Sequence, residues 1–120
     1  MANPNLIGVS SIYGKTVSAA VGTGSADILT CATDKLLKIN SIIVANIDGT
    51  NAATVNVLFY NGSTAFHLCK LANVSAGDTL IVLGKDAPIY LKETEKIQCL
   101  GSATGDLEIT VSYEEMDDSA

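Results

Sequence analysis

Turn signals divide this chain into short pieces along most of its length. Asp48-Gly49, Asn61-Gly62, Ala76-Gly77-Asp78 and Thr104-Gly105-Asp106 each combine glycine with Asp or Asn, the residues that tight turns favour. The pieces between these turns are rich in Val, Ile, Thr and aromatic residues, and none of them reads as a convincing helix. Short β-rich segments at this spacing are typical of an all-β sandwich or barrel.

The strongest predicted strand spans residues 37–47. Ile42 and Val44 make the middle of one face apolar. On strict alternation, the opposite face carries Leu37, Ile39, Ser41, Ile43, Ala45 and Ile47. A strand that is apolar on both faces is expected at the centre of a sheet or under cover on both sides.

The clearest one-sided strand is predicted at residues 107–115. Its core-facing positions would be Leu107, Ile109, Val111 and Tyr113, and its water-facing positions would be Glu108, Thr110, Ser112 and Glu114. Because the alternation is so regular, it predicts a buried Val111 and an exposed Glu108.

The same reasoning predicts strands at 54–60, 65–71, 80–83, 88–92 and 96–101 and, upstream, at 6–13, 16–21 and 26–31. Asn61-Gly62 marks a hairpin between the first two of these. Because the upstream signals are weaker, we count eight or nine strands in all, and two packed sheets are the natural way to close them. We therefore predict one all-β domain over residues 1–120. It would be a β-sandwich of jelly-roll or Ig-like type, with an N-terminal arm over 1–5 and an acidic tail over 116–120.

The chain is poor in charge for its size. Charged residues make up 17% of its 120 residues and hydrophobic residues 48%, whereas an average domain is about 25% charged. A monomer of this size exposes much of its surface, and few charges are present to cover it. We therefore expect part of the surface to be buried against other copies of the chain, in a homo-oligomer.

The net charge of −6 argues against nucleic acid as a partner. All seven basic residues are scattered lysines, and arginine, which is best suited to phosphate and guanine contacts, does not occur. The N-terminus lacks a basic segment followed by an apolar one, so no signal peptide is expected. No apolar run approaches the length of about 18 residues that a membrane helix needs. These features predict a protein made in a cytoplasm, without a membrane partner.

Histidine and cysteine give little support for a metal or catalytic site. His67 is the only histidine, and a site built on it would need Cys69, two positions along the strand and on the same face, plus distant ligands. The other cysteines, Cys31 and Cys99, lie 38 residues before and 30 residues after Cys69, without the close spacing of zinc ligands. All three lie in apolar segments and are interpreted as buried free thiols.

The remaining candidates also have simple structural interpretations. The carboxylates of Glu93 and Glu95 lie in a charged turn and those of Glu114 and Glu115 near the C-terminus, where we expect them to be solvated. The glycine-rich segment 21–25 lacks the spacing and the following helix of a phosphate loop. We therefore predict no catalytic residue, no metal site, no cofactor and no enzymatic activity. Four tyrosines fall within strand patterns and are expected in the core or at an interface: Tyr13, Tyr60, Tyr90 and Tyr113.

Short strings spread along the chain carry a resemblance to a known family. They are Asn3-Pro4-Asn5, Ser11-Ile12-Tyr13-Gly14-Lys15, Lys38-Ile39-Asn40, Asn46-Ile47-Asp48-Gly49, Ile89-Tyr90-Leu91-Lys92-Glu93 and Val111-Ser112-Tyr113-Glu114-Glu115. In these strings the chain resembles small all-β virion proteins of tailed phages, especially phages of marine cyanobacteria. The resemblance spans nearly the whole chain, but many such proteins have few cysteines, whereas three occur here. It implies a structural component of the particle and offers no catalytic residues to carry over.

Composition and resemblance together predict a non-enzymatic phage virion protein, first of all a capsid decoration or cement protein that stabilises the head. Its expected partners are further copies of itself, with a trimer favoured because it suits threefold positions on a capsid, and the major capsid protein or another virion protein. It would be made in the host cytoplasm and end on the virion. The alternatives are a neck, baseplate or fibre-tip component, or a glycan-binding module for host recognition.

Overall fold

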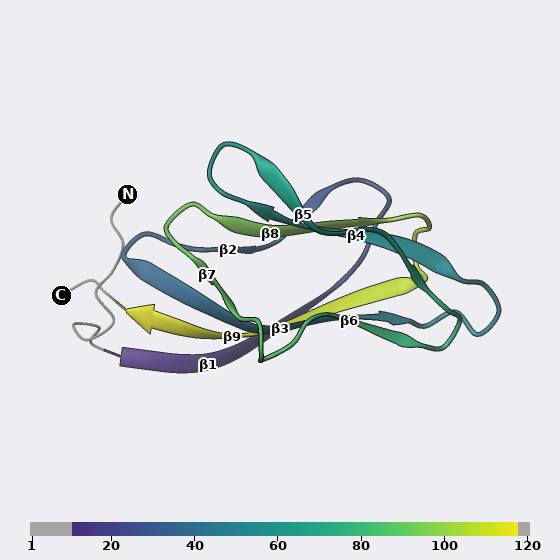
Figure 1. The fold of residues 1–120 in the computed structure, drawn as a ribbon, viewed down its shortest axis with the longest axis horizontal. Helices are drawn as coiled ribbons and strands as arrows, with labels where there is room; N and C mark the ends of the chain where they lie inside the picture. The colour runs from purple at the N-terminus through teal and green to yellow at the C-terminus, as the bar shows by residue number, and fades with distance from the viewer. Residues whose placement is uncertain (1–10, 118–120) are drawn as a thin grey trace.

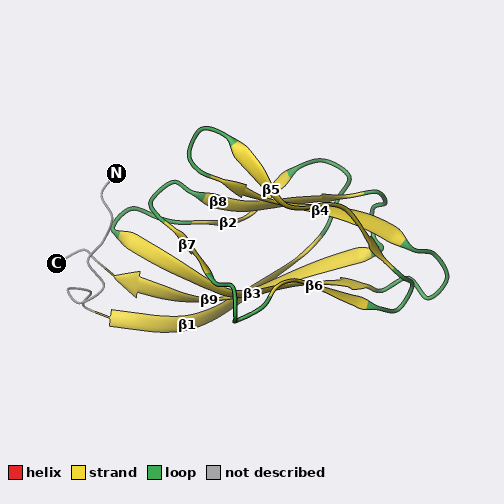
Figure 2. Ribbon diagram, in the orientation of Figure 1, coloured by secondary structure: helices red, strands yellow, loops and turns green. Residues whose placement is uncertain are grey.

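The computed structural model describes residues 11–117, and this part of the chain consists of β-strands joined by turns and loops, without a helix (Figure 2). The strands are β1 (Ser11–Ala20), β2 (Ala26–Thr30), β3 (Lys35–Asn46), β4 (Ala53–Tyr60), β5 (Ala65–Val74), β6 (Thr79–Leu83), β7 (Ile89–Leu91), β8 (Lys96–Gly101) and β9 (Leu107–Asp117). These nine strands agree with the predicted number. Within the same range, no helix is found that could cross a membrane.

The strands form two antiparallel sheets that pack face to face (Figure 1). Sheet A has the order β1-β9-β3-β6, with β7 also paired to β3, and sheet B has the order β2-β8-β4-β5. Neighbouring strands such as β1 and β9 are far apart in sequence, because the chain crosses repeatedly from one sheet to the other. This is the strand order of a jelly roll. The predicted β-sandwich is confirmed, and of the two expected topologies the jelly roll is the one observed.

The core lies between the two sheets and is filled by the inward rows of the long strands. On β9, Leu107, Ile109 and Val111 are all 0% exposed, while Glu108 is exposed. The predicted alternation of the last strand is therefore confirmed. Sheet B supplies the facing layer with fully buried residues that include Val55, Val57, Ile97 and Cys99.

Strand β3 does not follow the predicted alternation. Its pairing with β9 shifts between Ile39 and Ser41, so Asn40 is an extra residue in a β-bulge. A one-residue shift moves every later side chain to the opposite face. As a result Ile42 is fully buried beside Ile39, whereas Ile43 is only half-buried on the outer face. The alternation predicted for residues 37–47 therefore assigns side chains to the correct face as far as Ile39 and to the wrong face from Ser41 onward.

The hairpin predicted at Asn61-Gly62 is confirmed. It joins β4 to β5, and Gly62 has a φ of +98°, which a residue without a Cβ adopts at little cost. Asn61 Oδ1 accepts hydrogen bonds from the backbone N of Ser63 at 3.0 Å and of Thr64 at 2.9 Å. The asparagine side chain thus organises the turn that its backbone begins.

The predicted boundaries are least accurate near the two ends of the chain. The strands expected at 6–13 and 16–21 correspond to the single strand β1, and the part of that prediction before Ser11 lies outside the described residues, as does the arm over 1–5. Strand β9 continues to Asp117, so the first two residues of the expected acidic tail pair with β1 and β3 instead. Met116 is accordingly buried.

Candidate functional site

His67 and Cys69, which the sequence placed on one face, lie on opposite faces of β5. Cys69 pairs with Val57 and His67 pairs with Leu58, because the register shifts between these pairs. Val57 and Leu58 are consecutive and face opposite ways, and paired residues share a face. The prediction is therefore wrong: the bulge turns His67, which is exposed, away from the half-buried Cys69.

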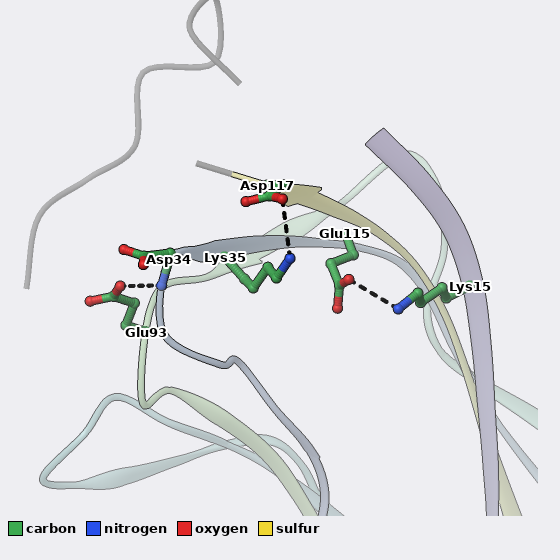
Figure 3. A network of polar contacts seen from close by, with 6 residues as sticks. All are labelled: Lys15, Asp34, Lys35, Glu93, Glu115 and Asp117. Carbon is green, nitrogen blue, oxygen red and sulfur yellow. Dashed lines mark hydrogen bonds and ion pairs between the residues drawn. The ribbon is translucent and has the colours of Figure 1, made fainter. Parts of the chain in front are cut away.

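Two ion pairs join neighbouring strands of sheet A (Figure 3). Lys15 Nζ lies 3.0 Å from Glu115 Oε1, linking β1 to β9, and Lys35 Nζ lies 3.5 Å from Asp117 Oδ2, linking β3 to β9. The hydrogen bond that Lys15 Nζ donates to Glu115 raises the pKa of Lys15. Both pairs are partly exposed, so we assign them the small stabilising effect of surface ion pairs.

The charged turn after β7 is more ordered than the sequence suggests. Glu95 is buried, and its Oε1 accepts a 2.7 Å hydrogen bond from the backbone N of Lys92. Glu93 accepts a hydrogen bond from the backbone N of Asp34 (Figure 3). Glu95 is thus not solvated as expected, because it closes its own turn.

Within residues 11–117, no three His, Cys, Asp or Glu side chains lie close enough together to hold a metal ion.

The glycine-rich segment after β1 serves to cross between the sheets. Val21 is buried, and its backbone N donates a 2.9 Å hydrogen bond to the carbonyl oxygen of Leu107. The carbonyl oxygen of Gly22 accepts a 2.8 Å bond from the backbone N of Gly101. Because the start of this crossing is hydrogen-bonded to β9 and β8, the segment has a structural role in the connection from β1 to β2.

The three cysteines are free thiols that differ in burial. Cys31 and Cys99 are buried, as predicted, while Cys69 is half-buried. Burial raises the pKa of both Cys31 and Cys99 to about 11, and it also raises the pKa of Cys69. The Cys31 Sγ donates a 3.2 Å hydrogen bond to the carbonyl oxygen of Lys35. These thiols pack as small apolar groups and are not activated nucleophiles.

Thiol labelling of the folded protein should therefore be slow at Cys31 and Cys99. Only the thiolate reacts, and with pKa values of about 11 both groups remain protonated at about pH 8. Iodoacetamide treatment followed by peptide mass spectrometry should show Cys69 labelled first and the other two only after unfolding. Equal labelling of all three in the folded protein would contradict this account of their burial.

The surface feature that sequence reasoning did not locate is a set of exposed apolar side chains carried by the edge strands of one flank. Strands β6 and β7 form the edge of sheet A opposite to β1, and β5 is the neighbouring edge of sheet B. These edge strands carry Phe66, Leu71, Ile81 and Tyr90, which are 56%, 65%, 69% and 43% exposed. We call these four residues the apolar flank. Large apolar groups gathered on a surface usually mark an interface.

The strand predicted at residues 37–47 is central in sheet A, which is one of the two positions expected for a strand that is apolar on both faces, and the apolar side chains of β3 are buried or half-buried. The sequence signal for the apolar flank lies in the continuous run Leu80-Ile81-Val82-Leu83, which is apolar on both faces. Because β6 belongs to one of two packed sheets, the face that carries Ile81 points away from the core and stays exposed. Tyr13 and Tyr90, expected in the core or at an interface, are 55% and 43% exposed and so lie outside the core.

Comparison with protein-family models and with curated protein sequences finds no match. Solved structures are similar in fold. A chain of the acid-stable capsid of Helicobacter pylori bacteriophage KHP30 superposes with a TM-score of 0.56 at 9% identity, covering 92% of this chain and 91% of that one. A chain of the Bacillus endospore appendages, which are disulfide-linked pili, gives a TM-score of 0.54 at 16% identity, covering 91% and 88%. At these identities the likeness is one of fold, and it extends over nearly the whole length of both chains.

Proposed function

We propose that this chain is a non-enzymatic structural protein of a phage particle and that it decorates or cements the capsid. The observation that carries the proposal is the apolar flank on a small, charge-poor jelly roll. A decoration protein must be soluble until it docks and rigid once docked. A sandwich with a continuous core and tight turns meets the second need, and an exposed apolar flank provides a surface for docking.

The fold likeness supports the same proposal. The chain matched in the capsid of the Helicobacter pylori phage is a similar jelly roll of nearly the same extent, with 91% of that chain covered. The protein would be made in the host cytoplasm and act on the virion.

We propose further that the chain assembles as a trimer through the apolar flank. Three copies suit the threefold positions of a capsid, and a closed ring would bury Leu71 and Ile81 of each copy symmetrically. The ion pairs of Lys15 and Lys35 would remain outside this contact, because charged groups are costly to bury. The major capsid protein or another virion protein would be the second partner.

The double variant Leu71→Asn/Ile81→Thr should lose self-association and binding to capsids that lack this protein. Both side chains are mostly exposed, so removing them takes away interface area and leaves the core unchanged. Asn suits position 71, where φ is +52°, and Thr suits a strand. Sedimentation of the pure protein and co-sedimentation with such capsids measure the two losses.

The control is Ile47→Thr, since Ile47 is 57% exposed but lies in the loop after β3 and is not one of the four residues of the apolar flank. It should assemble and bind like the unmodified chain. All three proteins should unfold at nearly the same temperature. A double variant that still assembles and binds would rule out the apolar flank as the interface, and an unmodified chain that binds no capsid would rule out the decoration role.

A fibre-tip component of the virion is the second candidate, because the chain is also similar in fold to a subunit of an extended appendage. The number of copies per virion distinguishes the decoration protein from the fibre-tip component. A decoration protein should be present in many copies per particle, and a fibre-tip protein in few. Quantitative mass spectrometry of purified virions provides this number.

A further inference from the structure

The four edge strands of the sandwich differ in how they are protected against pairing with another chain. Strand β5 has two register shifts against β4, and β2 has only five residues with a shift of its own. The edge made by β6 and β7 is interrupted between Leu83 and Ile89 by a segment that includes Pro88. Bulges, short strands and proline are the devices that keep sheet edges from pairing.

Strand β1 has none of these three devices, and of the charged side chains that also protect sheet edges it has one, Lys15. Its ten residues pair with β9 in one unbroken register from Ser11 to Ala20, without a bulge or a proline. Most of its residues are exposed, and Lys15 is its single charged residue. A long, regular edge strand presents a row of unpaired backbone N–H and C=O groups on its free side. The contrast with the other three edges indicates that β1 is left open for a partner strand.

The side chains of β1 show which strand fits beside it. Its first half carries the bulky, exposed Ile12 and Tyr13, and its second half carries Ser18, Ala19 and Ala20. An antiparallel copy of the same strand would place the bulky half of each chain against the small half of the other. The strand is therefore complementary in shape to itself when a second copy runs in the opposite direction.

We propose that β1 pairs with β1 of a second copy, antiparallel and centred on Thr16, so that sheet A continues through both molecules. A twofold axis perpendicular to the sheet leaves the inner face of both copies on the same side of the continuous sheet. With such an axis, one residue of β1 lies directly opposite the same residue of the second copy, and this residue is the centre of the pairing. Only centres at Lys15 and Thr16 keep nearly the full length of the strand paired. Centring on Lys15 would oppose two like charges, which is destabilising, and this leaves Thr16.

In this register the exposed groups of β1 find suitable neighbours. Ile12 lies opposite Ala20 of the second copy, and Tyr13 lies opposite its Ala19. On the outer face, Thr16 hydrogen-bonds to Ser112 within the chain at 3.4 Å, so two such hydroxyl pairs would meet at the twofold axis. The contact uses the flank opposite the apolar flank. It is therefore separate from the trimer contact proposed above and would join neighbouring trimers.

Engineered disulfides test both the pairing and its register. A Thr16→Cys chain should cross-link to itself, because directly opposed residues bring their Cβ atoms within disulfide reach. The Gly14→Cys chain and the Ser18→Cys chain should each remain without a cross-link when tested separately. A mixture of the two should cross-link, because position 14 of one copy lies opposite position 18 of the other. A Cβ added at Gly14 meets no atom within 4 Å, so this variant can fold. Non-reducing gels and peptide mass spectrometry identify the products.

Adding Thr16→Lys to both chains of the mixed pair should abolish the 14–18 cross-link by placing two lysines at the axis. The matched control is Thr79→Lys, the same change at an exposed position on the other edge of sheet A, which should leave the cross-link intact. Cross-linking through Lys15→Cys in place of Thr16→Cys would overturn the proposed register, and no cross-linking at any of these positions would overturn the pairing. Because no capsid is used, such a failure together with intact capsid binding would count against this contact alone.

Discussion

Replacing Val111 with aspartate should remove a large part of the protein's free energy of unfolding. The side chain of Val111 faces the core and is 0% exposed to solvent. The residue lies between Val17 on β1 and Ile42 on β3. An aspartate there would be an unpaired charge in an apolar layer, which costs about 3–5 kcal/mol or more. Domains of this size are stable by only about 5–15 kcal/mol. Circular dichroism during urea denaturation measures the loss.

The matched control is Glu108→Ala on the same strand. Glu108 is exposed and lies on the outer face, so its removal should change the free energy of unfolding by less than about 0.5 kcal/mol. Losses of similar size from the two variants would mean that the register of β9 is not the one described.

Ile42→Ala should have the second-largest effect, a loss of about 2–5 kcal/mol in the free energy of unfolding. Ile42 is 0% exposed and packs in the core between the sheets. The neighbouring Ile43 offers a control of identical chemistry on the outer face, where Ile43→Ala should cost about 1 kcal/mol. Without the bulge at Asn40 the order of the two effects would be reversed. A larger loss of unfolding free energy from Ile43→Ala than from Ile42→Ala would therefore contradict the observed assignment of Ile42 to the core face of β3.

The parts of the fold that were predictable are those fixed by local sequence. Strand β9 alternates without interruption between Leu107 and Val111, so its inward face could be assigned directly. Asn61 and Gly62 form their turn with their own backbone and side chains, so the hairpin was also predictable. In both cases the signal lies within a few consecutive residues.

The two bulged strands show what the sequence does not contain. The extra residue at Asn40 and the shifts in β5 exist only relative to a partner strand, because a bulge is a mismatch in length between two strands. Alternation read along one strand cannot reveal such a mismatch. This is why Ile43 was assigned to the wrong face and why His67 and Cys69 were placed together.

The presence of exposed apolar side chains was predictable from composition, but their position was not. A composition rich in apolar and poor in charged residues indicates buried contacts with other chains, but it does not say which strands lie at sheet edges. Ile81 and Leu71 are exposed because β6 and β5 are the last strands of their sheets. Sheet order depends on long-range pairing, and that information came from the structure.

Cryo-electron microscopy of the parent virion tests the proposed role most directly. We predict that this jelly roll occupies many symmetric positions on the outside of the head, in clusters of three whose contacts include Leu71 and Ile81. A head map accounted for entirely by other proteins, with this chain found only in the neck or tail or missing from the particle, would contradict the decoration role.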